Sequence, residues 1–526
     1  MRVRRPLLAV TALLAASACN CGDDPSSKPD PRLGAACTKQ VDCGSALLCF
    51  SGTCVESLPA SAACATPSAS PELLAGAAVV ADDPGVGVCT VAVQTPVFPA
   101  GAGLGQVQDL GVHTVGDVVT FTVPAGTWSV TVYEQAVGEV PASVTLQSGS
   151  TLPNVAVPDD VKLPGGTVLF DDTPASIPPD ADGFDDYSGF LAVHFGTPTP
   201  YTGTATWPNA TKGLELARVA GELPPGTWSM TVNDYAYECA TTYAGSCTGG
   251  GTTQQYRVHV LTKGPPRGTG RLDLDVYLAS ARFTAQTAAS SAAMQRVFDG
   301  AALKLGNAGI CLGTVTFHDL PAWARTRFEQ TDYDETKACD GVAQLFRLSL
   351  TQSANVHYFL VDEILAVQPG APGTQLLGLD GAIPGPSGLP GSPSSGAVAS
   401  LGTVSPCSGA FDLERCEADQ LGYVTAHEIG HWLGLFHTTE APGIFFDPLA
   451  DTGRCPCPRC ARSADRPRCG SDPDLYVTTS QCTASATCAG GDNLMFWIIS
   501  GNASRGRVST QQGEVARSNP AVQVTP

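Results

Sequence analysis

Apolar and polar residues alternate with a period of two over short runs in the first half of the chain. Val118–Val123 and Tyr256–Leu261 are two such runs, and turn residues such as Gly and Pro separate the runs from one another. A period of two places one face of a strand in a core and the other face toward solvent. Short alternating strands between turns are typical of paired antiparallel sheets, so residues 65–265 are predicted to form β-sandwich structure.

One segment of this region occurs twice. Pro124–Val132 reads PAGTWSVTV and Pro225–Val232 reads PGTWSMTV. The two tryptophans, Trp128 and Trp228, are 100 residues apart. The repeat indicates either two related halves of one sandwich or two small sandwiches, with the tryptophans as core anchors.

The second half of the chain mixes strand and helix patterns. Leu272–Leu278 alternates as a strand, whereas the apolar positions of Thr287–Leu305 recur at helical spacing. Thr314–Phe317 and Val356–Val361 read as further strands. Strands interspersed with helices are typical of a sheet covered by helices, so residues 266–526 are predicted to form a second domain of the α+β or α/β class.

The first residues of the chain read as an export signal. Residues 1–18 combine early arginines with an apolar run that is too short for a membrane span. Cys19 follows Ala-Ser-Ala, which resembles the lipobox of bacterial lipoproteins, so we expect a lipid on Cys19 and a flexible tether over residues 19–36. The predicted location is extracellular, or at the bacterial cell surface or outer membrane through that lipid alone.

The chain has 20 cysteines, which in an exported protein indicate disulfides. Residues 37–64 hold a group of closely spaced cysteines and are predicted to form a small cysteine-rich knot, with a four-cysteine zinc site as the alternative. Disulfides are also expected in a long insert around residues 455–488. The alternative there is a second zinc ion bound by Cys455, Cys457 and Cys460.

The formal net charge of −20 bears on the choice of partners. A strongly acidic chain repels phosphate backbones and anionic lipid surfaces, so no nucleic-acid partner is expected, and membrane contact is expected only through a lipid anchor. A basic peptide is compatible with this charge, although solubility alone also explains it. The sequence carries no indication of an oligomeric state.

The stretch HEIGHWLGLFH carries the chemistry of the chain. His427 and His431 are four residues apart, so on a helix they lie on one face and can grip one metal ion. Glu428 is too close to the first ligand to join it on the metal, which leaves its carboxylate free as a base. Gly434 permits a sharp turn after the helix, and this turn brings His437 round as the third ligand.

Three protein ligands leave one coordination position open, which separates a catalytic zinc site from a structural one. Zinc lowers the pKa of a bound water to about 7 and polarises a carbonyl. The expected reaction is therefore peptide-bond hydrolysis with Glu428 as general base. His318 and His357 lie on or beside predicted strands without a partner at ligand spacing, so a core or surface role is expected for both.

The extended pattern HExxHxxGxxH resembles the signature of the metzincin metalloproteases, and HEIGHWLGLFHT is most similar to their pappalysin branch. The resemblance implies a twisted mixed sheet above a zinc-binding helix, and a Met turn beneath the metal. Met495 is the methionine predicted for that turn, because of four methionines it alone follows the motif. Pappalysins commonly carry a tyrosine two residues later, where this chain has Trp497. Asp447 and Asp451 resemble the acidic segment that binds calcium in pappalysin-like enzymes, so the resemblance also implies Ca²⁺ there.

Together these features predict a secreted or surface-anchored zinc-dependent endopeptidase with one catalytic Zn²⁺ and a protein or peptide substrate. The alternative is a cell-surface adhesion or scaffold lipoprotein with a non-catalytic metzincin-like domain. The intact set of three histidines and Glu428 favours the enzyme, because drift in a vestigial domain readily spoils one of four such residues.

Overall fold

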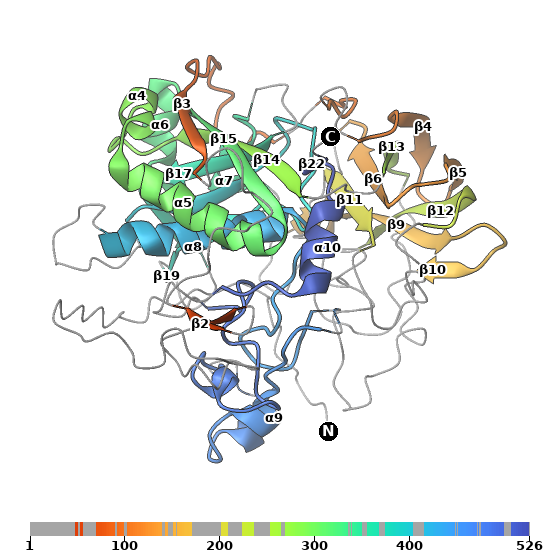
Figure 1. Cartoon of the computed structure of the whole chain (residues 1–526). Coiled ribbons are helices and arrows are strands. Elements are labelled where there is room, and N and C mark those ends of the chain that lie inside the picture. Colours follow the sequence, from red (N-terminus) through yellow and green to blue (C-terminus); the bar gives the residue numbers. More distant parts are fainter. Residues whose placement is uncertain are drawn as a thin grey trace, which may run out of the picture.

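The computed structural model is a mixed α/β structure with several sheets (Figure 1). The predicted signal peptide, the tether and Cys19 lie outside the described residues, as does most of the predicted knot. No helix among the described residues is both long and apolar enough to span a bilayer. The structure describes residues 48–50, 53–55, 70–89, 92–98, 103–138, 142–145, 151–153, 155–170, 201–208, 223–235, 253–264, 269–334, 337, 339–349, 355–367, 374–402, 415–447, 449, 451–470, 472, 475–498 and 506–524.

Two four-stranded antiparallel sheets make up the β-rich part of the chain, in the orders β10-β9-β12-β5 and β11-β6-β13-β4. Alternating side chains from both sheets meet in one apolar core, as the period of two predicts. The strands are β4 (Gln108–Thr114), β5 (Val118–Val123), β6 (Ser129–Ala136), β9 (Val155–Lys162), β10 (Val168–Phe170), β11 (Thr202–Trp207), β12 (Gly226–Tyr235) and β13 (Gln255–Lys263).

The repeated segments occupy equivalent places in these two sheets. β6 lies between β11 and β13 in one sheet, and β12 lies between β9 and β5 in the other. Trp228 is fully buried in the shared core, and its ring nitrogen donates to the carbonyl of Pro224 at 2.9 Å. Trp128 is only half-buried. The repeat therefore supplies an inner strand to each sheet, but only its second tryptophan is a core anchor.

A seven-stranded sheet dominates the second half of the chain, in the order β20-β21-β17-β14-β15-β3, with β22 pairing with β14. Its central strands run parallel, whereas β20 pairs antiparallel with β21 at one edge. The strands are β3 (Glu72–Ala75), β14 (Gly270–Leu278), β15 (Ile310–Asp319), β17 (Val356–Val361), β20 (Gly378–Asp380), β21 (Ala397–Ser400) and β22 (Gln523–Val524).

Helices cover both faces of this sheet. On one face the even-numbered residues of β14 pack against α5 and α8, and on the other face Tyr277 packs with α6 and α7. Figure 1 shows α5 and α8 side by side. Gly422 permits their close approach, because a Cβ there would lie 2.6 Å from the carbonyl oxygen of Val297. The helices are α4 (Ala285–Ala289), α5 (Ala292–Asn307), α6 (Ala322–Phe328), α7 (Gly341–Phe346) and α8 (Arg415–Trp432).

The predicted strands of both halves are confirmed, but the single helix expected over Thr287–Leu305 is two helices. α4 ends at Ser290, and Ser291 begins α5 by accepting a hydrogen bond from the backbone of Met294. A serine at this position favours a new N-cap over a continuous helix.

The β-sandwich region was predicted to begin at residue 65, but the first strand after that residue belongs to the sheet of the second half. β3 comes from the region predicted to be sandwich, yet it pairs parallel with β15 in the seven-stranded sheet. The segment that follows β3 is tied to the same part by the disulfide Cys89–Cys339. At the other end of the β-rich part, the buried Lys263 donates to the carbonyls of Arg517, Asn519 and Val522. These contacts join the two parts near the C-terminal helix.

The remaining elements are short. The disulfide-containing insert that holds α9 projects at the bottom of Figure 1. These remaining short elements are β1 (Leu48–Phe50), β2 (Thr53–Val55), β7 (Ala142–Thr145), β8 (Thr151–Pro153), β16 (Gln330–Tyr333), β18 (Glu363–Ala366), β19 (Thr374–Leu376), α9 (Cys457–Cys460), η3 (Arg466–Arg468), η4 (Gln481–Thr483) and α10 (Thr510–Ser518).

Candidate metal centre

Helix α8 carries the first half of the motif. Ile429 and Leu433 are buried in the core between α8 and the sheet, which fixes the rotation of the helix about its axis. His427 and His431 consequently share the opposite side, one helical turn apart, and are 1% and 4% exposed.

Gly434 ends the helix in the way its missing Cβ allows. Its φ is +103°, and its amide donates to the carbonyl of His431 at 2.8 Å. The amide of Leu435 closes the turn on the carbonyl of Gly430 at 3.0 Å. A Cβ at Gly434 would make only an ordinary contact with Val515, so there is space for a side chain. Glycine is required here because of the backbone conformation. The turn brings His437 back toward the helix.

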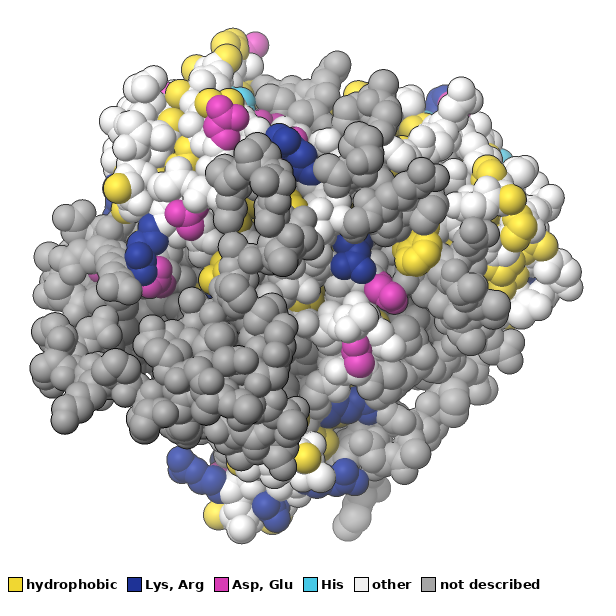
Figure 2. Space-filling view, viewed as in Figure 1, with side chains coloured by type: hydrophobic (Ala, Val, Ile, Leu, Met, Phe, Trp, Pro, Cys, Tyr) yellow, Lys and Arg dark blue, Asp and Glu magenta, His cyan; other side chains and the backbone are white. Residues whose placement is uncertain are grey.

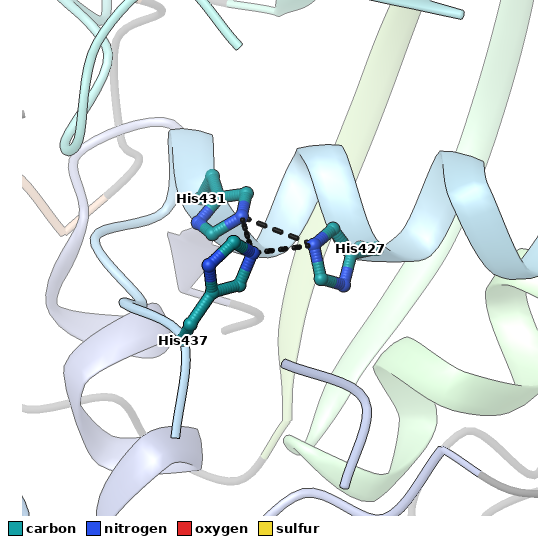
Figure 3. Close-up of side chains that lie close together, drawn as sticks. All are labelled: His427, His431 and His437. Atoms are coloured by element: carbon teal, nitrogen blue, oxygen red, sulfur yellow. Dashed lines mark hydrogen bonds between the residues drawn. The ribbon is translucent and has the colours of Figure 1, made fainter. Parts of the chain in front are cut away.

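The structure brings the three predicted ligands together. The Nε2 atoms of His427, His431 and His437 lie 3.1 Å from one another in every pair (Figure 3). All three side chains are buried. We call these residues the histidine trio.

The second nitrogen of each ring in the trio faces an oxygen atom. Nδ1 of His427 lies 2.7 Å from the carbonyl oxygen of Leu494, and Nδ1 of His431 lies 2.7 Å from that of Leu435. Nδ1 of His437 lies 2.9 Å from Oε1 of Glu440. Carbonyl and carboxylate oxygens only accept, so each Nδ1 carries the proton of a neutral imidazole and each Nε2 presents a lone pair. Three lone pairs this close repel one another, and a cation between them turns the repulsion into attraction.

The electrostatics of the trio agree with this assignment. Burial lowers the pKa of His427 to about 3, and the charge of His437 acts in the same direction. Burial likewise holds the pKa of His431 well below its usual range. Neutral imidazole is the form that binds a metal, and nitrogens with this spacing fit the about 2.0–2.1 Å bonds of zinc to histidine. The histidine trio could therefore hold a metal ion.

Glu428 lies beside the trio with a second carboxylate that the sequence reasoning did not identify. Glu428 and Asp380 are both buried, and together with His431 they present ligand atoms within 4.8 Å of one another. Burial first, and then the charge of Asp380, raises the pKa of Glu428 well above its usual range. Burial also raises the pKa of Asp380 to about 7, against the lowering effect of backbone amides and of His437. Asp380 stands in a Gly-rich and Pro-rich segment far from the motif, where the sequence carries no signal for a site residue.

Met495 lies directly beneath the motif helix. It is fully buried, and its sulfur would lie 2.6 Å from a Cβ built on Gly430. Its carbonyl accepts from the amide of Thr438, next to the third histidine, at 2.8 Å. The ring nitrogen of Trp497 donates to the carbonyl of Val477 at 2.8 Å, so Trp497 serves the packing of the insert.

The two acidic residues proposed to bind calcium have different surroundings. The carboxylate of Asp451 is exposed and accepts from the hydroxyl of Ser509 at 2.6 Å and from the amide of Gln511 at 2.9 Å, which places it at the start of α10. Asp447 is buried and accepts from the hydroxyl of Thr452 at 2.5 Å. The calcium site stays a prediction.

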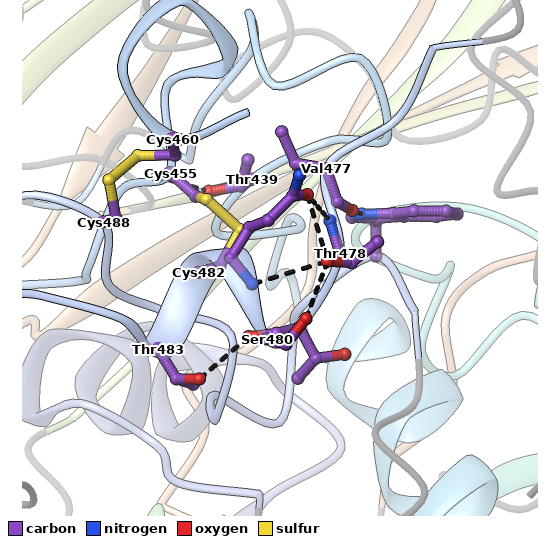
Figure 4. Close-up of a disulfide and its surroundings, with 12 residues drawn as sticks. Thr439, Cys455, Cys460, Val477, Thr478, Ser480, Cys482, Thr483 and Cys488 are labelled. Carbon is purple, nitrogen blue, oxygen red and sulfur yellow. Dashed lines mark hydrogen bonds between the residues drawn. A yellow bond between two sulfur atoms is a disulfide. The ribbon is translucent and has the colours of Figure 1, made fainter. Parts of the chain in front are cut away.

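The insert after the trio is held by disulfides. Its cysteines form the pairs Cys455–Cys482, Cys457–Cys469 and Cys460–Cys488, two of which appear in Figure 4. A sulfur in a disulfide is not a thiolate, so the alternative of a second zinc ion on Cys455, Cys457 and Cys460 does not agree with the structure. The described arginines of this insert give the acidic chain a local basic surface, which Figure 2 shows at the bottom of the view. The exposed ones are Arg459, Arg462, Arg466 and Arg468.

The same insert supports the loop that carries Glu440. The amide of Cys455 donates to the hydroxyl of Thr439 at 3.1 Å, and the amide of Cys457 donates to the carbonyl of Gly443 at 2.8 Å. Val477 adds a backbone bond to Ala441 at 2.9 Å. The loop that carries Glu440 is thus fixed by the insert, and Glu440 accepts a hydrogen bond from Nδ1 of His437. The sequence signal for this role was an acidic residue three positions after the last histidine of the motif.

No family model matches the chain, and no curated protein matches it. Among solved structures, metalloproteinase-II from Bacteroides fragilis is similar at 15% identity with a TM-score of 0.19, over 37% of this chain and 60% of that one. A family two carbohydrate esterase from Cellvibrio japonicus is similar at 8% identity with a TM-score of 0.12, over 41% of this chain and 53% of that one. The chain thus spans less than two thirds of either structure. A metalloproteinase is therefore a weak structural neighbour of this chain, and neither likeness carries weight beyond that.

Proposed function

We propose that the protein is a zinc-dependent endopeptidase, secreted or anchored at the cell surface. The observation that carries the proposal is the histidine trio, whose three lone pairs converge in a buried site beside the carboxylate of Glu428. Zinc suits such a set of imidazole nitrogens, and three protein ligands leave room for a water molecule.

The residues of the chain divide the work of hydrolysis. Zinc, when bound, activates a water molecule and polarises the peptide carbonyl. Glu428 accepts the proton of that water and passes it to the leaving nitrogen, so the amide bond breaks as a new C–O bond forms. Burial raises the pKa of Glu428 above its usual range, which favours uptake of the proton from water. Glu440 keeps the ring of His437 in its ligand orientation.

The edge of the seven-stranded sheet offers a place for the substrate. β20 is the last strand in the order, and Gly378 of this strand packs directly against the side chain of Glu428. An extended peptide paired with this edge would lie beside the base, held by backbone hydrogen bonds that read little sequence. A protein or peptide substrate is therefore part of the proposal.

The finer classification is also a proposal. A Met turn below a zinc-binding helix, with Met495 against Gly430, supports a metzincin-type domain of the pappalysin-like branch. Paired sheets with a shared core support a β-sandwich module before it. The disulfides support export to an oxidising compartment. Lipid attachment at Cys19 and calcium at Asp447 and Asp451 belong to the same proposal.

Cleavage of casein or a peptide library by the purified protein tests the function. The Glu428→Gln variant is expected to keep its zinc while the cleavage rate falls by about 10²–10⁴-fold, the usual contribution of a general base. Zinc content is measured by elemental analysis of both proteins. A Glu428→Gln variant that holds zinc and cleaves as fast as the wild type would show that the base is assigned wrongly.

A further inference from the structure

Asp380 has no role in the hydrolysis described above, yet it points into the site. It is the last residue of β20, is 6% exposed, and lies on the same side of the strand as Gly378, which packs on Glu428. Its carboxylate belongs to the group formed with Glu428 and His431, whose ligand atoms all lie within 4.8 Å of one another.

One oxygen of this carboxylate lacks a partner. In the part of the chain that the structure describes, Oδ2 of Asp380 is buried and has no hydrogen bond. A buried, unsatisfied carboxylate oxygen is costly, and two carboxylates close together repel each other. Oδ2 of Asp380 is therefore available as a ligand atom for a cation.

Two neighbouring carboxylates are suitable ligands for a divalent ion. Two-metal sites hold their ions about 3.5–4 Å apart, and carboxylate oxygens that bridge or flank the pair are their usual ligands. Nε2 of His431 already faces His427 and His437, and its Nδ1 bonds to the carbonyl of Leu435, so it has no nitrogen left for a second ion. The carboxylates of Asp380 and Glu428 remain as ligands beside the first metal.

We propose that Asp380 and Glu428 form a second, weaker divalent-cation site next to the histidine trio, and that its occupancy inhibits the protease. The proposal rests on the proposed function. The second ion binds more weakly, because the first ion already offsets the charge of both carboxylates and because only two protein side chains hold the second ion. Inhibition follows because a carboxylate of Glu428 bound to a cation no longer accepts a proton from water.

A zinc titration of the full-length, chelator-treated protein tests this site. Equilibrium dialysis with elemental analysis counts the bound ions per chain, and peptide cleavage is followed at the same zinc concentrations. The wild type is expected to gain activity with the first ion and to lose it as the second ion binds. In Asp380→Asn the first ion is retained and the second binds about 10–100-fold more weakly, so activity persists at concentrations that inhibit the wild type.

Asp340→Asn is the matched control. Asp340 is also 6% exposed, and burial likewise raises its pKa to about 7, but its oxygens cap α7 through the amide of Ala343 and accept from the amide of Asp334. Asn keeps the cap and loses only the second bond. This variant is expected to bind two ions and to be inhibited as the wild type is. The second site is refuted if the wild type binds one ion throughout the titration, or if Asp380→Asn is inhibited at the wild-type concentration. A failure of the proposed function shows differently, as an absence of cleavage at every zinc concentration while dialysis still counts the ions.

Discussion

The two faces of the seven-stranded sheet bury similar residues to different ends. On the face covered by α8 lie the histidine trio and two carboxylates. On the other face Asp275, His318 and His357 lie on the neighbouring strands β14, β15 and β17. Both groups contain buried histidines beside a buried carboxylate, so burial and composition do not distinguish them.

What distinguishes the two groups is where the ring nitrogens point. Both ring nitrogens of His318 are hydrogen-bonded to protein oxygens. Nδ1 lies 3.0 Å from the carbonyl oxygen of Ala77, and Nε2 lies 2.9 Å from the carboxylate of Asp275. His357 presents its ring edge to Tyr277, with centroids 5.9 Å apart, and burial lowers its pKa to about 4. Among the described residues, Asp275, His318 and His357 do not form a group whose ligand atoms all lie within 4.8 Å of one another. The contrast teaches that a metal site needs converging acceptors whose second nitrogens are held elsewhere.

The largest expected effect comes from removing one ring on each face. His437→Ala is expected to weaken zinc binding by at least about 100-fold and to abolish cleavage, because a direct ligand matters more than its supporting groups. His318→Ala is expected to retain zinc at the wild-type level. Dialysis followed by elemental analysis measures both variants, and equal zinc loss in the two would erase the contrast between the faces.

A methyl group added to each face separates catalysis from packing. A Cβ at Gly378 would lie 2.4 Å from the carboxylate of Glu428, so Gly378→Ala displaces the base and is expected to slow cleavage by up to about 100-fold with zinc retained. A Cβ at Gly396 would instead lie 2.6 Å from the ring of Phe346, on the other face. Gly396→Ala is expected to cost about 1–3 kcal/mol of stability through overpacking.

Kinetics and thermal melts of the two glycine variants provide the readings. A Gly378→Ala protein with wild-type kcat would show that the contact with Glu428 does not set the position of the base. A Gly396→Ala protein with the Tm of the wild type would show that the packing on the other face can accommodate a methyl group.

On each face a carboxylate is hydrogen-bonded to a histidine, and removing its charge is expected to change zinc affinity on one face only. Glu440→Gln keeps an acceptor oxygen near His437 but removes the charge, so zinc affinity is expected to fall about tenfold, at the low end for a supporting carboxylate. Asp275→Asn likewise removes the charge beside His318 while keeping an acceptor oxygen, and it is expected to leave zinc affinity unchanged. Competition with a chromogenic chelator measures both affinities. A drop in Asp275→Asn alone would contradict the assignment.

The smallest expected effect is a pH dependence of stability on the face without the histidine trio. Burial lowers the pKa of His318, but the bonds to Asp275 and Ala77 and the nearby acidic charges outweigh it, so the pKa is raised above 6.5 overall. A raised folded-state pKa stabilises the fold fully below the unfolded value of about 6.5 and no longer does so once the pH exceeds the folded value.

Melting curves of the wild type and of His318→Gln at several pH values test this effect. The difference in Tm is expected to be largest near pH 6 and to shrink by about 2–4 °C toward pH 9, the range for about 1 kcal/mol in a large domain. A difference that grows with pH would mean that His318 is neutral in the folded protein.

Local patterns predicted much of this structure. The alternation over Val118–Val123 and the strand-forming residues of Val356–Val361 identified strands to the residue, because each strand buries one or both faces along its whole length. The spacing of the motif identified which histidines meet, because a helical turn and a glycine turn are local geometries. The split of the helix at Ser290 was missed, because capping competes with helix continuation over only a few residues.

The amino-acid sequence by itself determined the histidine trio, the carboxylate of Glu428 beside it and the glycine that turns the chain between the second and third histidines. Only the tertiary structure decided that β3 joins the sheet of the second half, that Glu440 holds the third histidine and that Asp380 lies against Glu428. The reason is physical. Spacing along one helix is set by bonds within that helix, whereas Asp380 and Glu428 are brought together by the packing of an edge strand on a helix nearly fifty residues away, which no local pattern encodes.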